Sequence, residues 1–463
     1  MPQAYDTIVV GLGSAGTTAA STLAKAGRRV LALEAQDRIG GRVKTVKCGD
    51  GFVEEGAEWI HGTEDSRVYQ AAMNNNITVL PQDLDMEVYR SDGSAVNREL
   101  MEDLISFCLE RVGKPPDEPP MKLGNFITSR LMEYIKEKYP HLVDDKKFLK
   151  EFLDLVNLFV NNYEASNDWN DVSAQSRYEE LGGHQHMSWH RYGYKTFFEI
   201  LLNTYNNGPG LPNLDIKLNT EVTQIKWPRD TTGNVEVVCK DGSTYTASNV
   251  IVTLSLGVLK ERHTDLFDPE LPQNKITSID TLSMGIVAKI LLRFPYVWWR
   301  ENTASLFLWS DVDASSLDGS DWQRNVIEVS TPLARIDTLT IWTSGDRAKL
   351  IETLPENEVK SKCMQLLRRF MGRNHTIPEP VEMIRSTWFS NPFTRGSYSY
   401  DNLLTPQKPN LREDLASPLL DSAGSPRVLF AGEATNSVHF STVHGAAETG
   451  YREAMRLLPS SKV

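Results

Sequence analysis

Three glycines near the N-terminus have the spacing of a loop that binds a dinucleotide. Gly11, Gly13 and Gly16 form the pattern GxGxxG between an apolar run, 7–10, and an alanine-rich segment that predicts a helix. In such a loop the first glycine permits the tight turn and the second lets the backbone approach a pyrophosphate. The third lets the helix pack closely on the strand, and the helix N-terminus offers free N–H groups to the phosphate.

A carboxylate follows at the distance that this pattern requires. Glu34 ends the next predicted strand, 30–33, about 20 residues after Gly11, where it can bind both ribose hydroxyls. A glutamate at this position also disfavours NADP, because it would repel the 2′-phosphate. An isolated GxGxxG can be a purely structural turn, but two strands, a helix and a terminal acid together favour dinucleotide binding.

Two further residues could act on a bound cofactor or its substrate. Lys289 lies alone in the apolar run GIVAKILL, either as a lysine reaching out from a strand edge or as a functional lysine. We favour the functional role, because a lysine inside an apolar strand needs a reason. His61 follows Trp59 and Ile60, and an isolated histidine is more often structural than catalytic.

The predicted elements that position these residues alternate between strands and helices. Strand-like segments are 7–10, 30–33, 215–218, 221–226, 235–239, 250–254 and 428–431. Helical spacing of apolar residues is found at 102–111, 123–138, 146–161 and 444–458. Segments with the pattern of a dinucleotide-binding domain thus occur at both ends and in the middle of the chain.

We therefore predict an α/β fold (α+β overall) with two domains. Residues 1–80, 190–285 and 395–463 are expected to form a discontinuous Rossmann-like cofactor domain. Residues 81–189 and 286–394 are expected to form a substrate domain of mixed sheet plus helices. A length of 463 residues agrees with two domains.

Composition and charge exclude several classes of protein. The chain is 40% hydrophobic and 24% charged, which is typical of a globular protein. We expect no membrane segment and no signal peptide, since no run of about 18 apolar residues occurs. The net charge of −12 disfavours nucleic acid and can steer cations, although an acidic surface also simply aids solubility.

The cysteines and histidines give no sign of disulfides or of a metal. Four scattered cysteines without a CxxC pair suit a reducing compartment, so we expect a cytoplasmic protein. Residues 461–463, SKV, nearly match a peroxisomal targeting signal but lack its final Leu, so a peroxisomal location has weaker support than a cytoplasmic one. His184, His186 and His190 have no acidic or cysteine ligands at suitable spacing, so we expect no metal there. A monomer is compatible with the sequence, which leaves the oligomeric state open.

The motifs resemble those of the flavin amine oxidase family, in particular its polyamine oxidase branch. The matching segments are RIGGRVKT at 38–45, GAEWIHG at 56–62, VTLSLGVLK at 252–260, RGSYSY at 395–400, VLFAGE at 428–433 and FSTVHG at 440–445. The resemblance covers nearly the whole chain. It implies an FAD enzyme that oxidises a polyamine, spermine or an N1-acetylated polyamine, with O2. The products would be H2O2, an aminoaldehyde and a shorter amine.

The resemblance also implies roles for individual residues. Arg42 would neutralise the FAD diphosphate, Lys289 would hydrogen-bond a water at flavin N5, and His61 would contact the reacting amine. FAD would be bound without a covalent bond, because no cysteine follows Cys363. The implied cofactor-binding residues are Gly11, Gly13, Ser14, Ala15, Gly16, Glu34, Ala35, Gly41, Arg42, Gly56, Ala57, Glu58, Trp59, Val222, Trp388, Gly432, Glu433, Thr442 and Val443.

The substrate is less well defined by these motifs. The implied substrate-binding residues are His61, Glu179, Glu180, Tyr398, Ser441 and Thr442. Glu179 and Glu180 lie near the position at which relatives hold a distal ammonium, but the histidine-rich stretch that follows departs from the family pattern. An oxidase of another amine and a catalytically weak FAD-binding scaffold or sensor remain alternatives, and the presence of both His61 and Lys289 argues against the scaffold.

Overall fold

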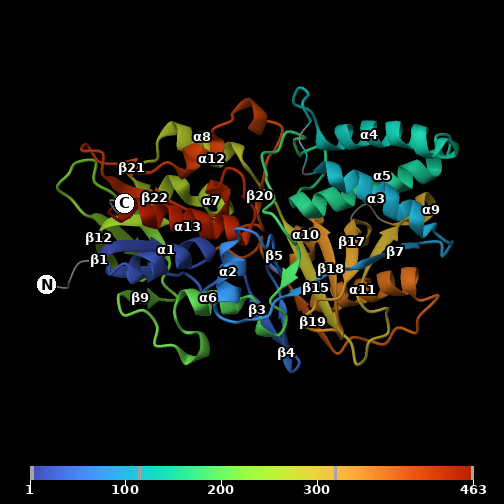
Figure 1. Cartoon of the computed structure of the whole chain (residues 1–463), viewed down its shortest axis with the longest axis horizontal. Helices are drawn as coiled ribbons and strands as arrows, with labels where there is room; N and C mark the ends of the chain where they lie inside the picture. Colours follow the sequence, from blue (N-terminus) through green and yellow to red (C-terminus); the bar gives the residue numbers. More distant parts are fainter. Residues whose placement is uncertain (1–4, 113, 115, 318–320, 460–463) are drawn as a thin grey trace.

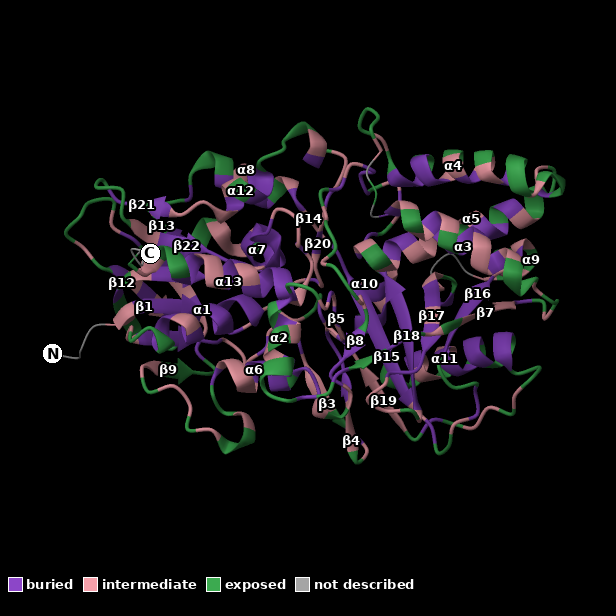
Figure 2. Cartoon of the chain, in the orientation of Figure 1, coloured by how far each residue is buried: buried purple, intermediate pink, exposed green. Residues whose placement is uncertain are grey.

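The computed structural model describes residues 5–112, 114, 116–317 and 321–459. Two large sheets lie side by side along the long axis of the molecule, each with helices packed on it (Figure 1). Buried residues are concentrated in these sheets and in the helix faces that cover them (Figure 2). The tail 461–463, on which the peroxisomal address depended, lies outside the described residues.

The first sheet has nine strands and holds the glycine loop. Its order is β13-β10-β11-β12-β1-β2-β9, and β22 pairs with β12 and β21. The strands are β1 (Tyr5–Val10), β2 (Val30–Leu33), β9 (Leu214–Lys217), β10 (Val222–Lys226), β11 (Val235–Cys239), β12 (Thr244–Val252), β13 (Phe267–Asp268), β21 (Leu419–Leu420) and β22 (Pro426–Phe430). The strands β2, β1, β12 and β22 run parallel. Such strands are apolar throughout because both faces of a parallel sheet are covered.

Alternate residues of β1 show how the two faces are covered. Val9 packs with the alanines of α1 (Ser14–Lys25) and α13 (Val443–Leu457), which lie against each other. Ile8 and Val10 face the opposite side and join the core beneath three helices, α7 (Leu256–Leu266), α8 (Gln273–Thr281) and α12 (Leu411–Ala416). This alternation follows from the two-residue repeat of a strand.

The second sheet has six strands in the order β19-β15-β18-β17-β16-β7. The strands are β7 (Asp85–Arg90), β15 (Val287–Arg293), β16 (Thr303–Leu308), β17 (Val326–Ser330), β18 (Thr338–Ser344) and β19 (Glu382–Arg385). All pairs are antiparallel except β16 with β7. Helices α3 (Arg98–Val112), α4 (Leu123–Lys138) and α5 (Lys146–Glu164) form one hydrophobic core with β16. Helix α11 (Glu356–Met371) packs into another core with β15 and β18.

The remaining helices and strands are short. They are β3 (Thr45–Cys48), β4 (Gly51–Glu54), β5 (Trp59–Ile60), α2 (Arg67–Asn74), β6 (Leu80–Pro81), β8 (Met187–Ser188), α6 (Lys195–Leu201), α7 (Leu256–Leu266), α8 (Gln273–Thr281), β14 (Ser283–Met284), α9 (Asp311–Ser316), α10 (Gly345–Thr353), β20 (Ser399–Tyr400) and α12 (Leu411–Ala416). Strand β5 pairs with β8, which also pairs with β6, so that the segment 59–62 is held against 184–188.

The predicted fold class is confirmed. Helix α4 and strands β2 and β11 have the predicted bounds, and the other predicted elements differ by a few residues at their ends. Among the described residues, no helix is both long enough and apolar enough to cross a membrane. All four cysteines of the chain are described, and each is buried with a free thiol.

Candidate active site

A cavity of about 440 Å³ is lined by residues of both sheets. The loops that follow β1, β2 and β22 reach it through Gly11, Glu34 and Gly432. These loops lie at the carboxyl ends of parallel strands, which is where open α/β sheets bind their ligands. From the second sheet, Lys289 and Trp342 complete the wall.

Most of the predicted site residues line this one cavity. They are Gly11, Gly13, Ser14, Ala15, Glu34, Ala35, Gly41, Arg42, Gly56, Ala57, Glu58, Trp59, His61, Glu180, Val222, Lys289, Trp388, Tyr398, Gly432, Glu433, Ser441, Thr442 and Val443. Gly16 and Glu179 are not among the lining residues. The side chain of Glu179 is exposed, and its backbone N–H donates to the carbonyl of Val438.

The second and third glycines of the loop have different roles. A Cβ on Gly16 would lie 1.9 Å from the carbonyl oxygen of Gly11, so only glycine lets α1 pack this closely. A Cβ on Gly13 would find no atom nearer than 3.9 Å and would project toward Gly41. Gly13 and Gly41 approach each other closely, since a Cβ on Gly41 would lie 3.2 Å from the Cα of Gly13, and both line the cavity. The free N–H groups at the N-terminus of α1, which begins after Gly13, suit a diphosphate there.

Glu34 is held in place by the backbone. One carboxylate oxygen accepts from the N–H of Leu12 at 2.8 Å and the other from the N–H of Gln36 at 2.9 Å. Burial raises the pKa of Glu34, while these hydrogen bonds act in the opposite direction. Oε1 also accepts from Nε2 of Gln36 at 3.5 Å, whereas Oε2 keeps a lone pair for a ribose hydroxyl, so the carboxylate fits an adenosine.

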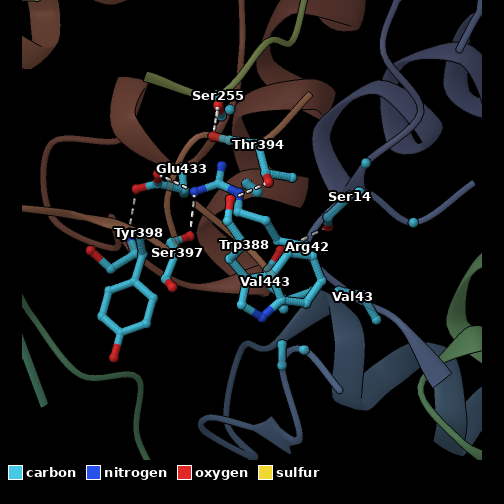
Figure 3. Close-up of a pocket in the computed structure, with 18 of the residues that line it drawn as sticks. Ser14, Arg42, Val43, Ser255, Trp388, Thr394, Ser397, Tyr398, Glu433 and Val443 are labelled. Atoms are coloured by element: carbon cyan, nitrogen blue, oxygen red, sulfur yellow. Dashed lines mark hydrogen bonds and ion pairs between the residues drawn. The ribbon is translucent and has the colours of Figure 1, made fainter. Parts of the chain in front are cut away.

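Arg42 and Glu433 form an ion pair on the wall of the same cavity (Figure 3). Nη1 of Arg42 donates to Oε1 of Glu433 at 2.9 Å and to the carbonyl of Ser397 at 2.7 Å. The other oxygen of Glu433 accepts from the Ser399 hydroxyl at 2.7 Å and the Ser441 N–H at 2.9 Å. Burial opposes ionisation of Glu433, but the charge of Arg42 and these hydrogen bonds hold its pKa below the usual value.

Lys289 is buried and faces the cavity from β15. Ile290 and Leu292 pack into the core with α11, so the alternate residue Lys289 points to the other face. The side chain is 4% exposed, and its Nζ donates to Oε2 of Glu58 at 2.8 Å and to the carbonyl of Glu54 at 3.1 Å. It also lies 4.4 Å from the ring centre of Trp342, its partner across the strand pair β15–β18.

His61 is neutral and presents one free lone pair. Its Nδ1 lies 2.7 Å from the carbonyl of Gln185, and because a carbonyl only accepts, Nδ1 carries the proton. The lone pair is therefore on Nε2. Burial and the neighbouring His186 lower the pKa of His61 to about 4, so the ring is neutral at pH 7 and can accept a hydrogen bond.

Aromatic side chains form the wall between Lys289 and His61. Trp59 stacks on Trp342 with ring centres 5.5 Å apart and planes inclined by 12°. Tyr398 packs in the same cluster and donates its hydroxyl to the carbonyl of Asn162 at 2.7 Å. Trp388 is 5% exposed and also lines the cavity. Faces of this kind suit an aliphatic cation.

The hydroxyl groups of Ser441 and Thr442 have partners within the protein. Thr442 caps α13, since its Oγ1 accepts from the N–H of Gly445 at 2.9 Å and donates to the carbonyl of His439 at 2.7 Å. Ser441 donates to the carbonyl of Ser399. Both residues line the cavity, but their hydroxyl groups primarily fix the start of α13.

Sequence reasoning missed several residues of the cavity. The missed acidic and aromatic residues are Glu55, Tyr163, Glu164, Tyr178, His186, Glu221, Trp342, Phe393 and Phe440. Glu164 ends α5, and burial together with the nearby Asp401 raises its pKa to about 8. No motif marks Glu164, and Trp342 could have been found only from the pairing of β15 with β18.

Comparisons with known proteins agree with this geometry. Residues 14–458 match the model of the family described as flavin containing amine oxidoreductase. The human peroxisomal N(1)-acetyl-spermine/spermidine oxidase is 30% identical, covering 97% of this chain and 94% of the relative. Polyamine oxidase 3 of Oryza sativa subsp. japonica is 29% identical, covering 96% and 88%. A solved structure of putrescine oxidase bound to putrescine has the same fold, with a TM-score of 0.68 and 20% identity over 98% of both chains.

These matches extend over almost the entire chain. The N-terminus of α1 at Gly13, the fixed carboxylate of Glu34 and the charge of Arg42 fit a flavin dinucleotide. The predicted enzyme class and flavin cofactor are confirmed by the family match. The protein belongs to the family of flavin-containing amine oxidoreductases.

Proposed function

We propose that the protein oxidises a polyamine with O2, using non-covalently bound FAD and releasing H2O2, an aminoaldehyde and a shorter amine. The observation that carries this proposal is a neutral His61 and a buried Lys289 on one aromatic-walled cavity with the dinucleotide loop. The names of the human and rice relatives support the choice of a polyamine. When bound, FAD supplies the acceptor for the hydride that leaves the carbon beside the amine nitrogen.

In this proposal the chain positions the substrate amine in its neutral form. Nε2 of His61 accepts a hydrogen bond from the reacting nitrogen, which must be neutral before its neighbouring carbon can release hydride. Trp59 and Trp342 hold the aliphatic chain and exclude water. Nζ of Lys289 orders a water beside the flavin, while Glu58 and the Glu54 carbonyl fix its position.

The proposed division of labour follows the two sheets. Residues 1–80, 190–285 and 395–463 bind FAD, and residues 81–189 and 286–394 cover the substrate end of the cavity. Four buried free thiols support a cytoplasmic location.

Two carboxylates are placed to recognise the distal charge of a free polyamine. Glu180 is exposed, lines the cavity and accepts from the Tyr163 hydroxyl at 3.1 Å. Glu164 lines the cavity from the end of α5, and a bound ammonium would lower its raised pKa by stabilising the carboxylate. An acetylated polyamine carries a neutral amide at that end and gains less from either group.

We expect spermine to have a higher kcat/KM than N1-acetylspermine when peroxide release is measured. Glu180→Gln should narrow this preference by up to about fivefold, because an ion pair at an exposed carboxylate contributes at most roughly 1 kcal/mol. Glu179→Gln is the matched control, since Glu179 does not line the cavity and should leave the preference unchanged. A wild-type preference for the acetylated amine would contradict the substrate assignment, and no peroxide with any amine would contradict the proposed function.

Acid precipitation tests how the flavin is held. Beyond Cys363 the chain has no cysteine, and its four thiols lie outside the cavity lining. We therefore expect trichloroacetic acid to release all of the yellow colour into the supernatant, measured as absorbance near the flavin maximum. Colour that remains in the protein pellet would show a covalent bond.

A further inference from the structure

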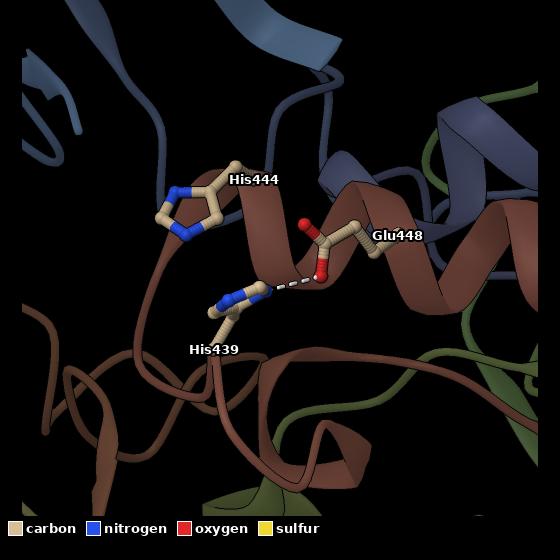
Figure 4. A group of neighbouring side chains, drawn as sticks. All are labelled: His439, His444 and Glu448. Atoms are coloured by element: carbon tan, nitrogen blue, oxygen red, sulfur yellow. Dashed lines mark hydrogen bonds and ion pairs between the residues drawn. The ribbon is translucent and has the colours of Figure 1, made fainter. Parts of the chain in front are cut away.

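Two histidines and a glutamate meet at the start of α13, outside the catalytic residues described above. His439, His444 and Glu448 each offer a ligand atom, and these atoms all lie within 4.8 Å of one another. His444 and Glu448 are four residues apart on α13, which places both on one face of the helix. His439 reaches them from the loop before the helix, and the three side chains point toward one another (Figure 4).

One nitrogen in this group has no partner. His444 is 2% exposed, and its Nε2 makes no hydrogen bond to any described residue. A buried polar atom without a hydrogen bond lowers the free energy of unfolding, so a ligand bound at this nitrogen would stabilise the fold.

The surroundings support a cation. Nδ1 of His439 and Oε2 of Glu448 are 2.8 Å apart, and their side chains are 18% and 27% exposed, which gives an ion a path from solvent. Asn436 donates to Oε2 of Glu448 at 2.9 Å and accepts from the N–H of His439 at 2.9 Å, so it orients both.

We propose that His439, His444 and Glu448 form a binding site for Zn²⁺. Two imidazoles and one carboxylate are a known zinc ligand set, with a water in the fourth position. Small side-chain rotations would bring the three atoms to about 2.0–2.2 Å from a common ion. Binding replaces the proton shared by His439 and Glu448, which is released to solvent.

The site was not foreseen because its ligands depend on the loop that precedes α13. Sequence reasoning considered a metal only at His184, His186 and His190, where no suitable third ligand type follows. Phe440, Ser441, Thr442 and Val443 lie between the two histidine ligands and line the cofactor cavity. A bound ion would therefore brace one wall of that cavity.

Calorimetric titration of the FAD-loaded, EDTA-treated protein with Zn²⁺ tests this site. We expect one equivalent to bind, with an affinity at least about tenfold weaker in both His439→Ala and Glu448→Gln. His184→Ala is the matched control, because His184 forms a similar pair with Asp83 at 3.0 Å but, among the described residues, belongs to no group of three candidate ligands. It should bind as the wild type does.

X-ray absorption at the zinc edge of the wild type gives an answer that does not depend on how the variants fold. The first shell should contain only nitrogen and oxygen, with the outer scattering of two imidazoles. The proposal is overturned if the wild type shows no saturable binding or if the zinc has sulfur neighbours. It is equally overturned if His439→Ala and Glu448→Gln retain wild-type affinity, or if His184→Ala alone loses it.

Discussion

Lys289→Met is expected to slow flavin reduction, reoxidation or both by at least about tenfold while FAD stays bound, a rise of more than about 1.4 kcal/mol in the barrier. Methionine keeps the length and packing of the side chain but removes the charge that lies between Glu58, the Glu54 carbonyl and the Trp342 ring. Stopped-flow absorbance of the flavin, with amine and with O2 in separate experiments, measures the two half-reactions.

Lys289 forms an ion pair with Glu58, so the single variant changes two things at once, and a double variant is needed to separate them. Lys289→Met leaves the carboxylate of Glu58 buried without its partner, which is itself destabilising. The double variant Lys289→Met/Glu58→Gln removes that unpaired charge. We expect the double variant to recover thermal stability but to remain slow. Wild-type rates in both half-reactions of the double variant would show that Lys289 serves only to neutralise Glu58.

Arg42→Met is expected to weaken FAD binding by about ten- to a hundredfold, since a hydrogen bond to a charged group contributes roughly 1.5–3 kcal/mol. Both contacts of Arg42 with described residues use Nη1, so its other N–H groups remain for a phosphate oxygen. Fluorescence titration of the apoprotein with FAD measures the dissociation constant.

Glu433 provides the control for this second variant. Loss of Arg42 leaves the buried carboxylate of Glu433 without its ion-pair partner. The unpaired charge could weaken FAD binding indirectly by disturbing the loop after β22. In Arg42→Met/Glu433→Gln the neutral amide retains a hydrogen-bonding group beside Ser399 and Ser441. We expect FAD binding to stay weak in this double variant. Restored affinity would mean that Arg42 acts on Glu433 and not on the cofactor.

The sequence predicts those parts of the fold and site that depend on local pattern. The glycine loop, the strand ending at Glu34 and the helix spacing of α4 follow from short-range periodicity and turn chemistry. The structure brings His61 and Lys289 to one cavity, as the motifs indicated. Their roles in catalysis stay predictions.

Other features depend on contacts between distant segments. The ion pair of Lys289 with Glu58 joins residues about 230 positions apart, and no local rule anticipates such a pairing. Adjacent glutamates in an irregular segment cannot be separated by periodicity, so the different orientations of Glu179 and Glu180 were not predictable. Glu164 precedes Ala165, whose left-handed backbone (φ 56°) ends α5 and has no glycine or asparagine to signal it.

The order of strands in the first sheet also has a consequence for synthesis on the ribosome. Strand β1 pairs with β12, and β12 pairs in turn with β22, whose end lies about 420 positions after that of β1. At roughly 5–20 residues per second, the last central strand emerges about 20–80 s after the first. Strand β12 ends about 180 positions before β22, so its apolar edge awaits its partner for about 9–36 s while the nascent chain is still growing. Chaperones that shield exposed strand edges are therefore expected to determine how much enzyme a cell recovers from each round of translation.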